Sequence, residues 1–127
     1  MGHMVLMIGT FDGCLDDYRR ALHDGGFGVI RADAHDATRL LPALRPAVCV
    51  LDIRSLGERG WDLCKLIRSI PTTSSTTLLL LAGTDGYRRG VLAARARRLR
   101  CTVFSTHLTT SDFVDGIATL LACGGSA

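Results

Sequence analysis

The sequence lacks several features that mark special classes of protein. None of its apolar runs approaches the roughly 20 residues that a transmembrane helix needs. Its start lacks the basic, apolar and small-residue pattern of a secretory signal. No internal repeat or low-complexity tract interrupts the chain. We therefore expect a cytoplasmic protein that does not enter a membrane.

The cysteines and histidines lack the spacings of common metal sites. Five cysteines are scattered along the chain without a C-x-x-C pair, which argues against zinc and against a redox dithiol. The four histidines share no metal-ligand spacing. We expect the cysteines to be small buried residues in a reducing compartment, and we expect neither a metal site nor a cofactor.

Length and composition favour a single domain. The chain has 127 residues, of which 47% are hydrophobic, and this is enough for a sizeable core. We expect residues 1–3 to be an expression scar, residues 4–123 to form the domain, and residues 124–127 to be a flexible tail.

Positive charge gathers in one segment of the chain. The formal net charge is +3, yet residues 87–127 hold six arginines against only Asp112 and Asp115. All six arginines fall between residues 88 and 100. A mild overall charge does not imply a nucleic-acid partner, but a local stripe of one sign favours a charged binding partner.

Hydrophobic periodicity predicts strands and helices in alternation. Apolar runs indicate strands at residues 5–8, 28–31, 47–52, 77–82 and 102–104. Helical spacing indicates helices at residues 14–23, 61–70 and 88–99, a helix after Asp33 that carries the apolar residues 37, 40, 41 and 44, and a last helix from residue 110 or 111. We expect Asp33 to cap the second helix, Pro42 to break or kink it, and Thr110 or Ser111 to cap the last. Trp61 is expected to be partly buried at the start of the third helix.

Five strand–helix pairs of this length predict an α/β fold with right-handed crossovers. The sheet should be doubly wound, with five parallel strands in the order 2-1-3-4-5 and helices on both faces, as in flavodoxin-like proteins.

The most informative residue is Asp52, which ends an unbroken apolar run at residues 47–51. Such a run is typical of a strand buried on both faces of a parallel sheet. Its carboxyl end is where open α/β sheets build their sites. A carboxylate in this place has a second use, because it can cap the following loop by accepting backbone N–H bonds.

The residues around Asp52 resemble the CheY-like receiver domains of bacterial response regulators. The segment 48–54, then Gly60, the segment 63–68 and Pro71 follow that family's order of buried strand, phospho-accepting aspartate, loop and helix. The resemblance extends over residues 5–122 in element order. It implies the predicted fold and a place in two-component signal transduction.

The resemblance also implies that the partners of the acceptor are missing. The family's acidic pair, which holds Mg²⁺, falls on Gly9 and Thr10; its hydroxyl residue falls on Ala82 and its lysine on Ser105. Asp12 lies three residues after Gly9 in the sequence and is also a candidate site residue. Arg54, two residues after Asp52, is the last residue of this degenerate site. A hard cation needs charged oxygen ligands, so Mg²⁺ binding through Asp12 and Asp52 is expected to be weak or absent.

Two short patterns resemble phosphatase motifs without the necessary chemistry. Thr10 stands where a haloacid dehalogenase-type motif has its nucleophilic aspartate. Cys14 and Arg20 have the spacing of tyrosine phosphatases, but Asp16 and Asp17 between them would repel a phosphate. We expect no enzymatic activity.

The arginine stripe is the second candidate site. In receiver domains the surface of the fourth helix, fifth strand and fifth helix carries dimer and output contacts. A two-fold dimer would set this stripe against the acidic start of the last helix. The alternative is a solvated helix face. The residues concerned are Arg88, Arg89, Arg95, Arg97, Arg98 and Arg100, with Asp112 and Asp115.

These observations predict an atypical receiver domain that acts through protein contacts, with little or no Mg²⁺-dependent phosphorylation of Asp52. Its expected partners are a second copy, a histidine kinase or an output domain, and not DNA bound directly. Two alternatives stay open. One is a weak phospho-acceptor of a DNA-binding transcriptional regulator, which would use Mg²⁺. The other is a small flavodoxin-like ligand-binding protein.

Overall fold

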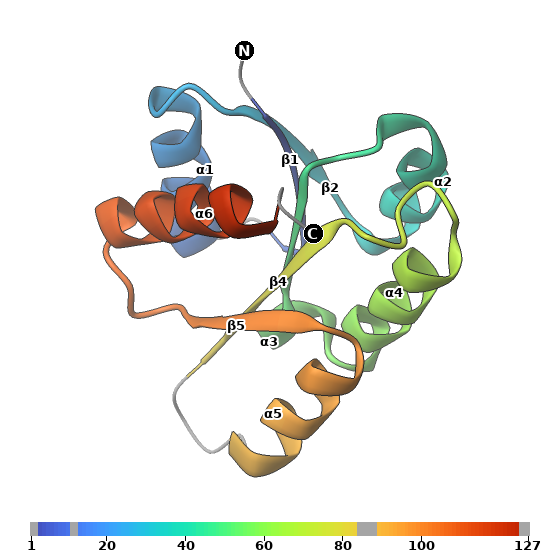
Figure 1. Ribbon diagram of the computed structural model, residues 1–127. Coiled ribbons are helices and arrows are strands. Elements are labelled where there is room, and N and C mark those ends of the chain that lie inside the picture. Colours follow the sequence, from blue (N-terminus) through green and yellow to red (C-terminus); the bar gives the residue numbers. More distant parts are fainter. Residues whose placement is uncertain (1–2, 11–12, 84–88, 125–127) are drawn as a thin grey trace.

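The computed structural model describes residues 3–10, 13–83 and 89–124. They form one parallel sheet covered by helices on both faces, as Figure 1 shows. The five strands lie in the order β2-β1-β3-β4-β5, which confirms the predicted topology. The strands are β1 (Met4–Ile8), β2 (Gly28–Ala32), β3 (Val48–Asp52), β4 (Thr77–Ala82) and β5 (Cys101–Ser105).

Alternation along the central strands divides the core into two layers. The even-numbered side chains of β1 and β4 and the odd-numbered side chains of β3 point to one face of the sheet. The remaining side chains of these three strands point to the other face. Strands with both faces covered are nearly continuous apolar runs, and every residue of β3 is buried, including Asp52 at its end. The edge strands β2 and β5 are only half-buried.

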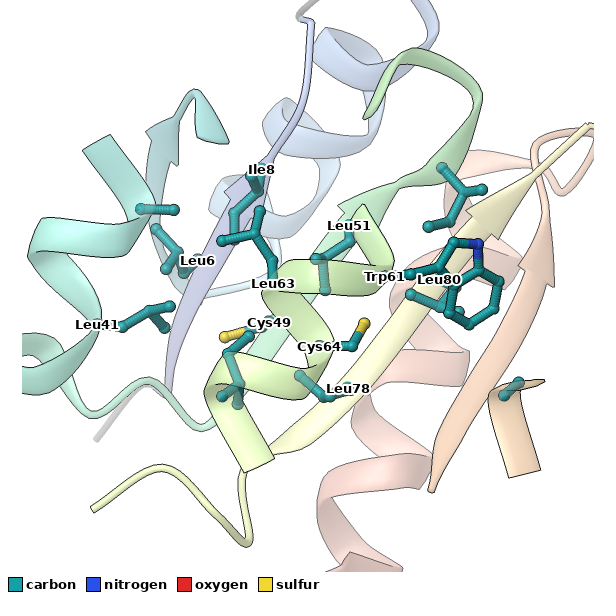
Figure 2. Packing of buried hydrophobic residues seen from close by; sticks show 14 of the residues in the cluster. Leu6, Ile8, Leu41, Cys49, Leu51, Trp61, Leu63, Cys64, Leu78 and Leu80 are labelled. Atoms are coloured by element: carbon teal, nitrogen blue, oxygen red, sulfur yellow. The ribbon is translucent and has the colours of Figure 1, made fainter. Parts of the chain in front are cut away.

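The helices cover the sheet unequally. On one face lie α1 (Gly13–Asp24) and α6 (Thr110–Gly124), whose side chains join the smaller core cluster. On the other lie α2 (Ala34–Leu44), the short α3 (Ile53–Leu56), α4 (Glu58–Ser69) and α5 (Arg89–Arg98). Figure 2 shows Trp61, Leu63 and Cys64 of α4 above the residues of the central strands. No helix among the described residues combines the length and the apolar character that crossing a membrane requires.

Several local predictions need correction. The segment predicted as a loop after Asp52 forms α3, and α4 begins at Glu58 rather than at Trp61. Trp61 is fully buried rather than partly so. Pro42 does not break α2: although its ring removes one backbone donor, the helix continues for two more residues to Leu44 and ends there, with Arg45 in the left-handed conformation.

The helix caps follow simple polar chemistry. The Asp33 carboxylate accepts from the Asp36 backbone N–H at 2.8 Å, as predicted. The predicted cap of the last helix is wrong by one residue or more, since the hydroxyl of Thr109 accepts from the Asp112 N–H at 3.1 Å. The capping residue is decided by where the backbone enters the helix. The sequence offers several neighbouring hydroxyl residues that could occupy this position, so it does not single out one of them.

Candidate functional site

Asp52 lies at the carboxyl end of β3, in the middle of the sheet, and its side chain is only 1% exposed. It is the residue before α3, and its carboxylate accepts from the Arg54 backbone N–H at 3.1 Å. The capping role considered from the sequence is therefore confirmed. Strand and short helix together hold the carboxylate in one place, because the strand fixes its Cα and the helix start fixes its oxygen.

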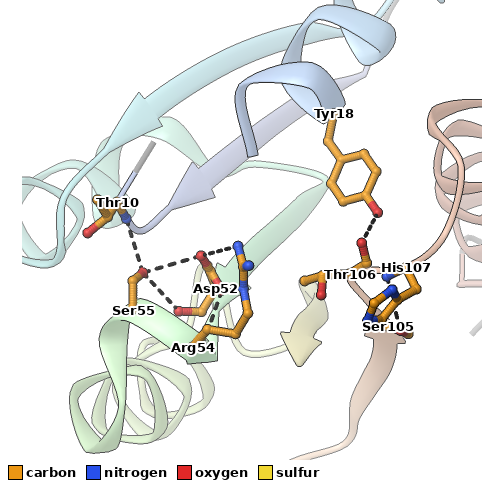
Figure 3. A network of polar contacts seen from close by, with 8 residues as sticks. All are labelled: Thr10, Tyr18, Asp52, Arg54, Ser55, Ser105, Thr106 and His107. Atoms are coloured by element: carbon orange, nitrogen blue, oxygen red, sulfur yellow. Dashed lines mark hydrogen bonds and ion pairs between the residues drawn. The ribbon is translucent and has the colours of Figure 1, made fainter. Parts of the chain in front are cut away.

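The Arg54 side chain folds back onto Asp52 (Figure 3). Its Nε donates to Asp52 Oδ1 at 3.0 Å and its Nη2 donates to Oδ2 at 3.1 Å. This two-point geometry matches a planar guanidinium to a carboxylate and is the strongest form of such a pair. The Arg54 side chain is 32% exposed, so the pair has one face in water and one in the core. The positive charge needed to hold a buried carboxylate comes from the protein itself.

Ser55 closes the other side of the carboxylate. Its hydroxyl lies 3.4 Å from Asp52 Oδ2 and 3.3 Å from the Asp52 carbonyl oxygen. The same hydroxyl accepts from the Thr10 backbone N–H at 3.1 Å. Ser55 thus connects the loop after β1 to the start of α3, and sequence reasoning missed this role. The signal for it was the close spacing of Asp52, Arg54 and Ser55 at a strand end.

Gly9 is pressed directly against the aspartate. A Cβ atom at this position would lie 2.8 Å from the Cβ of Asp52 and 3.1 Å from the Ser55 hydroxyl. Its φ of +151° also disfavours any side chain. In a metal-binding receiver this position would carry an acidic residue. The backbone of this chain leaves no room there for such a side chain.

Ala82 and Ser105 lie across from Asp52 at the ends of β4 and β5, where they are paired in register. The Ser105 hydroxyl accepts from the His107 backbone N–H at 3.1 Å, so it serves the turn after β5. The loop that follows is held by Tyr18, whose hydroxyl donates to the Thr106 and Leu108 carbonyls at 3.0 and 2.7 Å. Figure 3 shows Ser105 and Asp52 on separate strands, each with its own polar partners. The anchoring role of Tyr18 was not evident from the sequence.

The described residues around Asp52 do not fit a magnesium ion. Mg²⁺ requires a near-octahedral set of oxygen ligands, and proteins bind it through one or two carboxylates together with waters or phosphate oxygens. Asp52 is the only carboxylate in the contacts described above, and a guanidinium occupies both of its oxygens. The described residues contain no cluster of three or more metal-ligating side chains. Asp12 lies outside the described residues.

The fold has clear relatives among solved structures. CheY4, a chemotaxis response regulator of Vibrio cholerae, is similar over 94% of this chain and 99% of its own, with 16% identity and a TM-score of 0.81. A CheY-like receiver domain protein from Methanospirillum hungatei JF-1 is similar over 99% and 98%, with 13% identity and a TM-score of 0.82. A LuxR-family two-component response regulator from Aurantimonas sp. SI85-9A1 is similar over 96% and 86%, with 21% identity and a TM-score of 0.79.

This chain has the receiver fold. No protein-family model matches the sequence, and no curated protein matches it significantly. The fold predicted from the resemblance is thus confirmed by three-dimensional similarity.

The arginine stripe of this receiver fold is divided into two parts. Arg95 turns inward: its two terminal nitrogens donate to the Glu58 carboxylate at 2.8 and 3.0 Å, and its guanidinium lies 4.4 Å from the Trp61 ring centroid. The Arg95 guanidinium lowers the pKa of Glu58 below its ordinary value. Arg95 therefore joins α5 to α4, and its guanidinium is already engaged by these contacts.

The other arginines of the stripe remain at the surface. Arg97 and Arg98 are exposed at the end of α5, and Arg100 is exposed in the turn before β5. Asp112 and Asp115 are exposed on α6. Arg88 and the side chain of Arg89 lie outside the described residues.

A mostly apolar hollow of about 240 Å³ is lined by residues of α5 and β5. Figure 1 shows β5 as the edge strand between α5 and α6. Val103, in the middle of β5, is the large hydrophobic side chain that stands out to solvent among the described residues, at 36% exposure. The hollow is lined by Ala82, Gly83, Leu92, Ala93, Val103, Phe104 and Ser105.

Proposed function

We propose that this receiver fold is a regulatory interaction module of two-component signalling that has little or no Mg²⁺-dependent phosphorylation at Asp52 and no enzymatic activity of its own. The observation that carries the proposal is the paired contact between the Asp52 carboxylate and the Arg54 guanidinium. Transfer of a phosphoryl group to an aspartate requires a carboxylate oxygen to attack the phosphorus. Here Arg54 donates to both oxygens, so the attacking oxygen would first have to give up a charge-assisted hydrogen bond.

The charge balance of the site supports the same proposal. A phosphodonor is an anion, and a cation next to the acceptor is needed to offset its repulsion from the carboxylate. Arg54 supplies one positive charge, but the carboxylate already neutralises it. With Ala82 and Ser105 at the positions of the family's hydroxyl and lysine, the incoming group would meet no free cation on β4 or β5 among the described residues.

Two neighbouring features support a homodimer through α5, β5 and α6. Arg97 and Arg98 on α5 and Asp112 and Asp115 on α6 carry opposite charges on either side of β5. In a two-fold arrangement, the arginines of one copy would face the aspartates of the other. Exposed ion pairs contribute little each, so Val103 and the hollow beside it would supply the apolar centre.

The phosphorylation part is tested with acetyl phosphate and, separately, with beryllofluoride, each with Mg²⁺. A receiver domain that carries the full acidic pair and lysine serves as the positive control. We expect intact-mass spectrometry to find no phosphorylated species and fluorine NMR to find no bound beryllofluoride. Stoichiometric modification of Asp52 would refute the proposal and support the weak phospho-acceptor instead.

The dimer part is tested by analytical ultracentrifugation over a range of concentrations. We expect a monomer–dimer equilibrium that weakens in the Arg97→Asp/Arg98→Asp variant and is restored when Asp112 and Asp115 are changed to arginine in the same chain. Arg39→Asp on α2 is the matched control, since it changes charge by the same kind of substitution away from this face. A protein that stays monomeric at all concentrations would exclude this dimer.

A further inference from the structure

A second hollow lies between α2 and α4, which are neighbouring helices on the face of the sheet that carries the larger core cluster (Figure 1). Its volume is about 380 Å³. This is within the range of about 300–1,000 Å³ that is typical of small-ligand pockets. The α2 wall consists of Ala34, His35 and Thr38, and α4 supplies the rest of the lining.

The base of the hollow is apolar and continuous with the core. Leu63 is 5% exposed and belongs to the larger core cluster, while Ala34 and Leu66 are half-buried and pack against it. A ligand group that displaces water from these side chains gains hydrophobic free energy in proportion to the apolar area that it covers. The hollow therefore favours a ligand with an aliphatic part.

The rim carries two opposite charges that the protein leaves unpaired. Arg59 and Asp62 are exposed on α4, and neither makes a hydrogen bond or an ion pair with another residue of the described ranges. The order of the two residues is the reason. On α2 the aspartate precedes the arginine, and Asp36 and Arg39 pair at 3.2 Å. On α4 the arginine comes first, which is the less favourable orientation, and both side chains line the hollow instead.

The α2 wall adds two polar groups. The Thr38 hydroxyl donates to the Ala34 carbonyl at 3.0 Å, so its oxygen keeps lone pairs that can accept from a ligand. His35 is exposed and makes no hydrogen bond or ion pair within the part of the chain that the structure describes. The hollow thus offers a cation, a carboxylate and a hydroxyl acceptor above an apolar base.

The mixed charge of the rim selects the chemistry of the ligand. A phosphate ion would be attracted by Arg59 but repelled by Asp62, and a metal ion would meet the reverse. A zwitterion satisfies both residues, because its carboxylate pairs with the guanidinium while its ammonium group pairs with the aspartate. A free α-amino acid carries these two charges on one carbon atom. Residues three apart on a helix have Cβ atoms about 5–6 Å from each other, so their side chains can hold both charges at once.

We propose that the hollow between α2 and α4 is a binding site for a free α-amino acid with an aliphatic side chain, such as leucine. Arg59 holds the carboxylate, Asp62 and the Thr38 hydroxyl hold the ammonium group, and the aliphatic side chain covers the apolar base. The charges are exposed, so each contact is weak, and we expect a dissociation constant on the order of 1 mM. This site does not rest on the proposed function, since its lining residues make none of the contacts that hold Asp52.

The test is a titration of the nitrogen-15-labelled chain with L-leucine, followed by two-dimensional NMR. We expect saturable shifts of the amide signals of residues 34–38 and 59–66. Isocaproate, which lacks the ammonium group of leucine, and isopentylamine, which lacks its carboxylate, should each bind about fivefold more weakly. Inorganic phosphate should leave these signals unchanged.

Variants of α4 make the assignment specific. Arg59→Gln and Asp62→Asn should each weaken leucine binding about fivefold, which is the effect of one exposed charge contact. Lys65→Gln is the matched control, since it removes a cation from the same helix outside the hollow and should leave the affinity unchanged. The remaining amide signals report whether each variant is folded.

Three outcomes would overturn the proposal. The first is the absence of a saturable shift with leucine up to about ten times the expected dissociation constant. The second is a shift of the same signals by phosphate, which would indicate a simple anion site. The third is leucine binding that is as tight in both α4 variants as in the parent chain.

Discussion

The pair between Asp52 and Arg54 gives a quantitative prediction about stability. The Asp52 side chain is 1% exposed, and Arg54→Ala would leave its carboxylate with only the backbone N–H of residue 54 and the Ser55 hydroxyl as partners. Removing one member of a fully buried pair costs about 3–5 kcal/mol of unfolding free energy. The Arg54 side chain is 32% exposed, so water can replace part of it. We therefore expect a loss of about 2–3 kcal/mol.

Urea unfolding followed by circular dichroism measures this loss. The matched control is Arg39→Ala, which removes an arginine from an exposed pair with Asp36 at 3.2 Å. That change should cost less than about 0.5 kcal/mol, since exposed pairs contribute little. In an Asp52→Asn background, Arg54→Ala should cost only about 1 kcal/mol, because no buried charge is then left unpaired.

The outcome that refutes this reasoning is equally clear. A loss below about 0.5 kcal/mol for Arg54→Ala, or an equal loss in the presence and absence of the Asp52 charge, would show that the guanidinium does not compensate the carboxylate. Phosphorylation assays on the same variant separate two causes. If Arg54 alone blocked the acceptor, Arg54→Ala would become labelled; we expect no labelling, because the positions of the acidic pair are still Gly9 and Thr10.

Three further predictions concern other contacts. Gly116→Ala places a Cβ 2.6 Å from the Phe104 ring. Calorimetry should show a loss of about 1–2 kcal/mol of unfolding free energy after the gain in helix propensity is subtracted. No loss would mean that the ring moves freely. The Arg68 guanidinium donates to four backbone carbonyls, those of Ser74, Thr76, Leu99 and Arg100. Arg68→Lys, which cannot reach all four at once, should cost about 3 kcal/mol in urea unfolding, and a neutral result would contradict these hydrogen bonds. The folded-state pKa of Glu58 is lowered by Arg95, so the stability it contributes is present above its ordinary value of 4.5 and is lost as the pH falls through the lower folded value. Glu58→Gln should flatten the acid side of the stability profile, and an unchanged profile would argue against this contact.

The fold was largely predictable because its signal is repeated along the chain. Each buried strand is a short apolar run, and parallel strands joined by helices leave few allowed arrangements. The order β2-β1-β3-β4-β5 and the burial of β3 followed from this pattern. The turns and caps were less predictable, as α3 and the Thr109 cap show, because several sequences satisfy the same backbone geometry.

The candidate site was predictable only in part. Its position and the absence of an acidic pair, hydroxyl and lysine followed from the resemblance of residues 48–54 to receiver domains. That Arg54 would turn back onto Asp52, rather than extend into solvent, depended on where α3 begins. The same is true of Arg95, which the sequence placed in a uniform stripe and the structure pairs with Glu58 and Trp61.

By itself the sequence determined the order of elements, the core and the residue types at the site. These are local properties, because apolar periodicity and residue identity need no knowledge of distant neighbours. The tertiary structure decided how closely Gly9 approaches Asp52, that Arg54 turns back onto Asp52, and that Arg95 meets Glu58 and Trp61. The first and last of these contacts join residues far apart in the chain, and only the packing of helices on the sheet sets the distances between them.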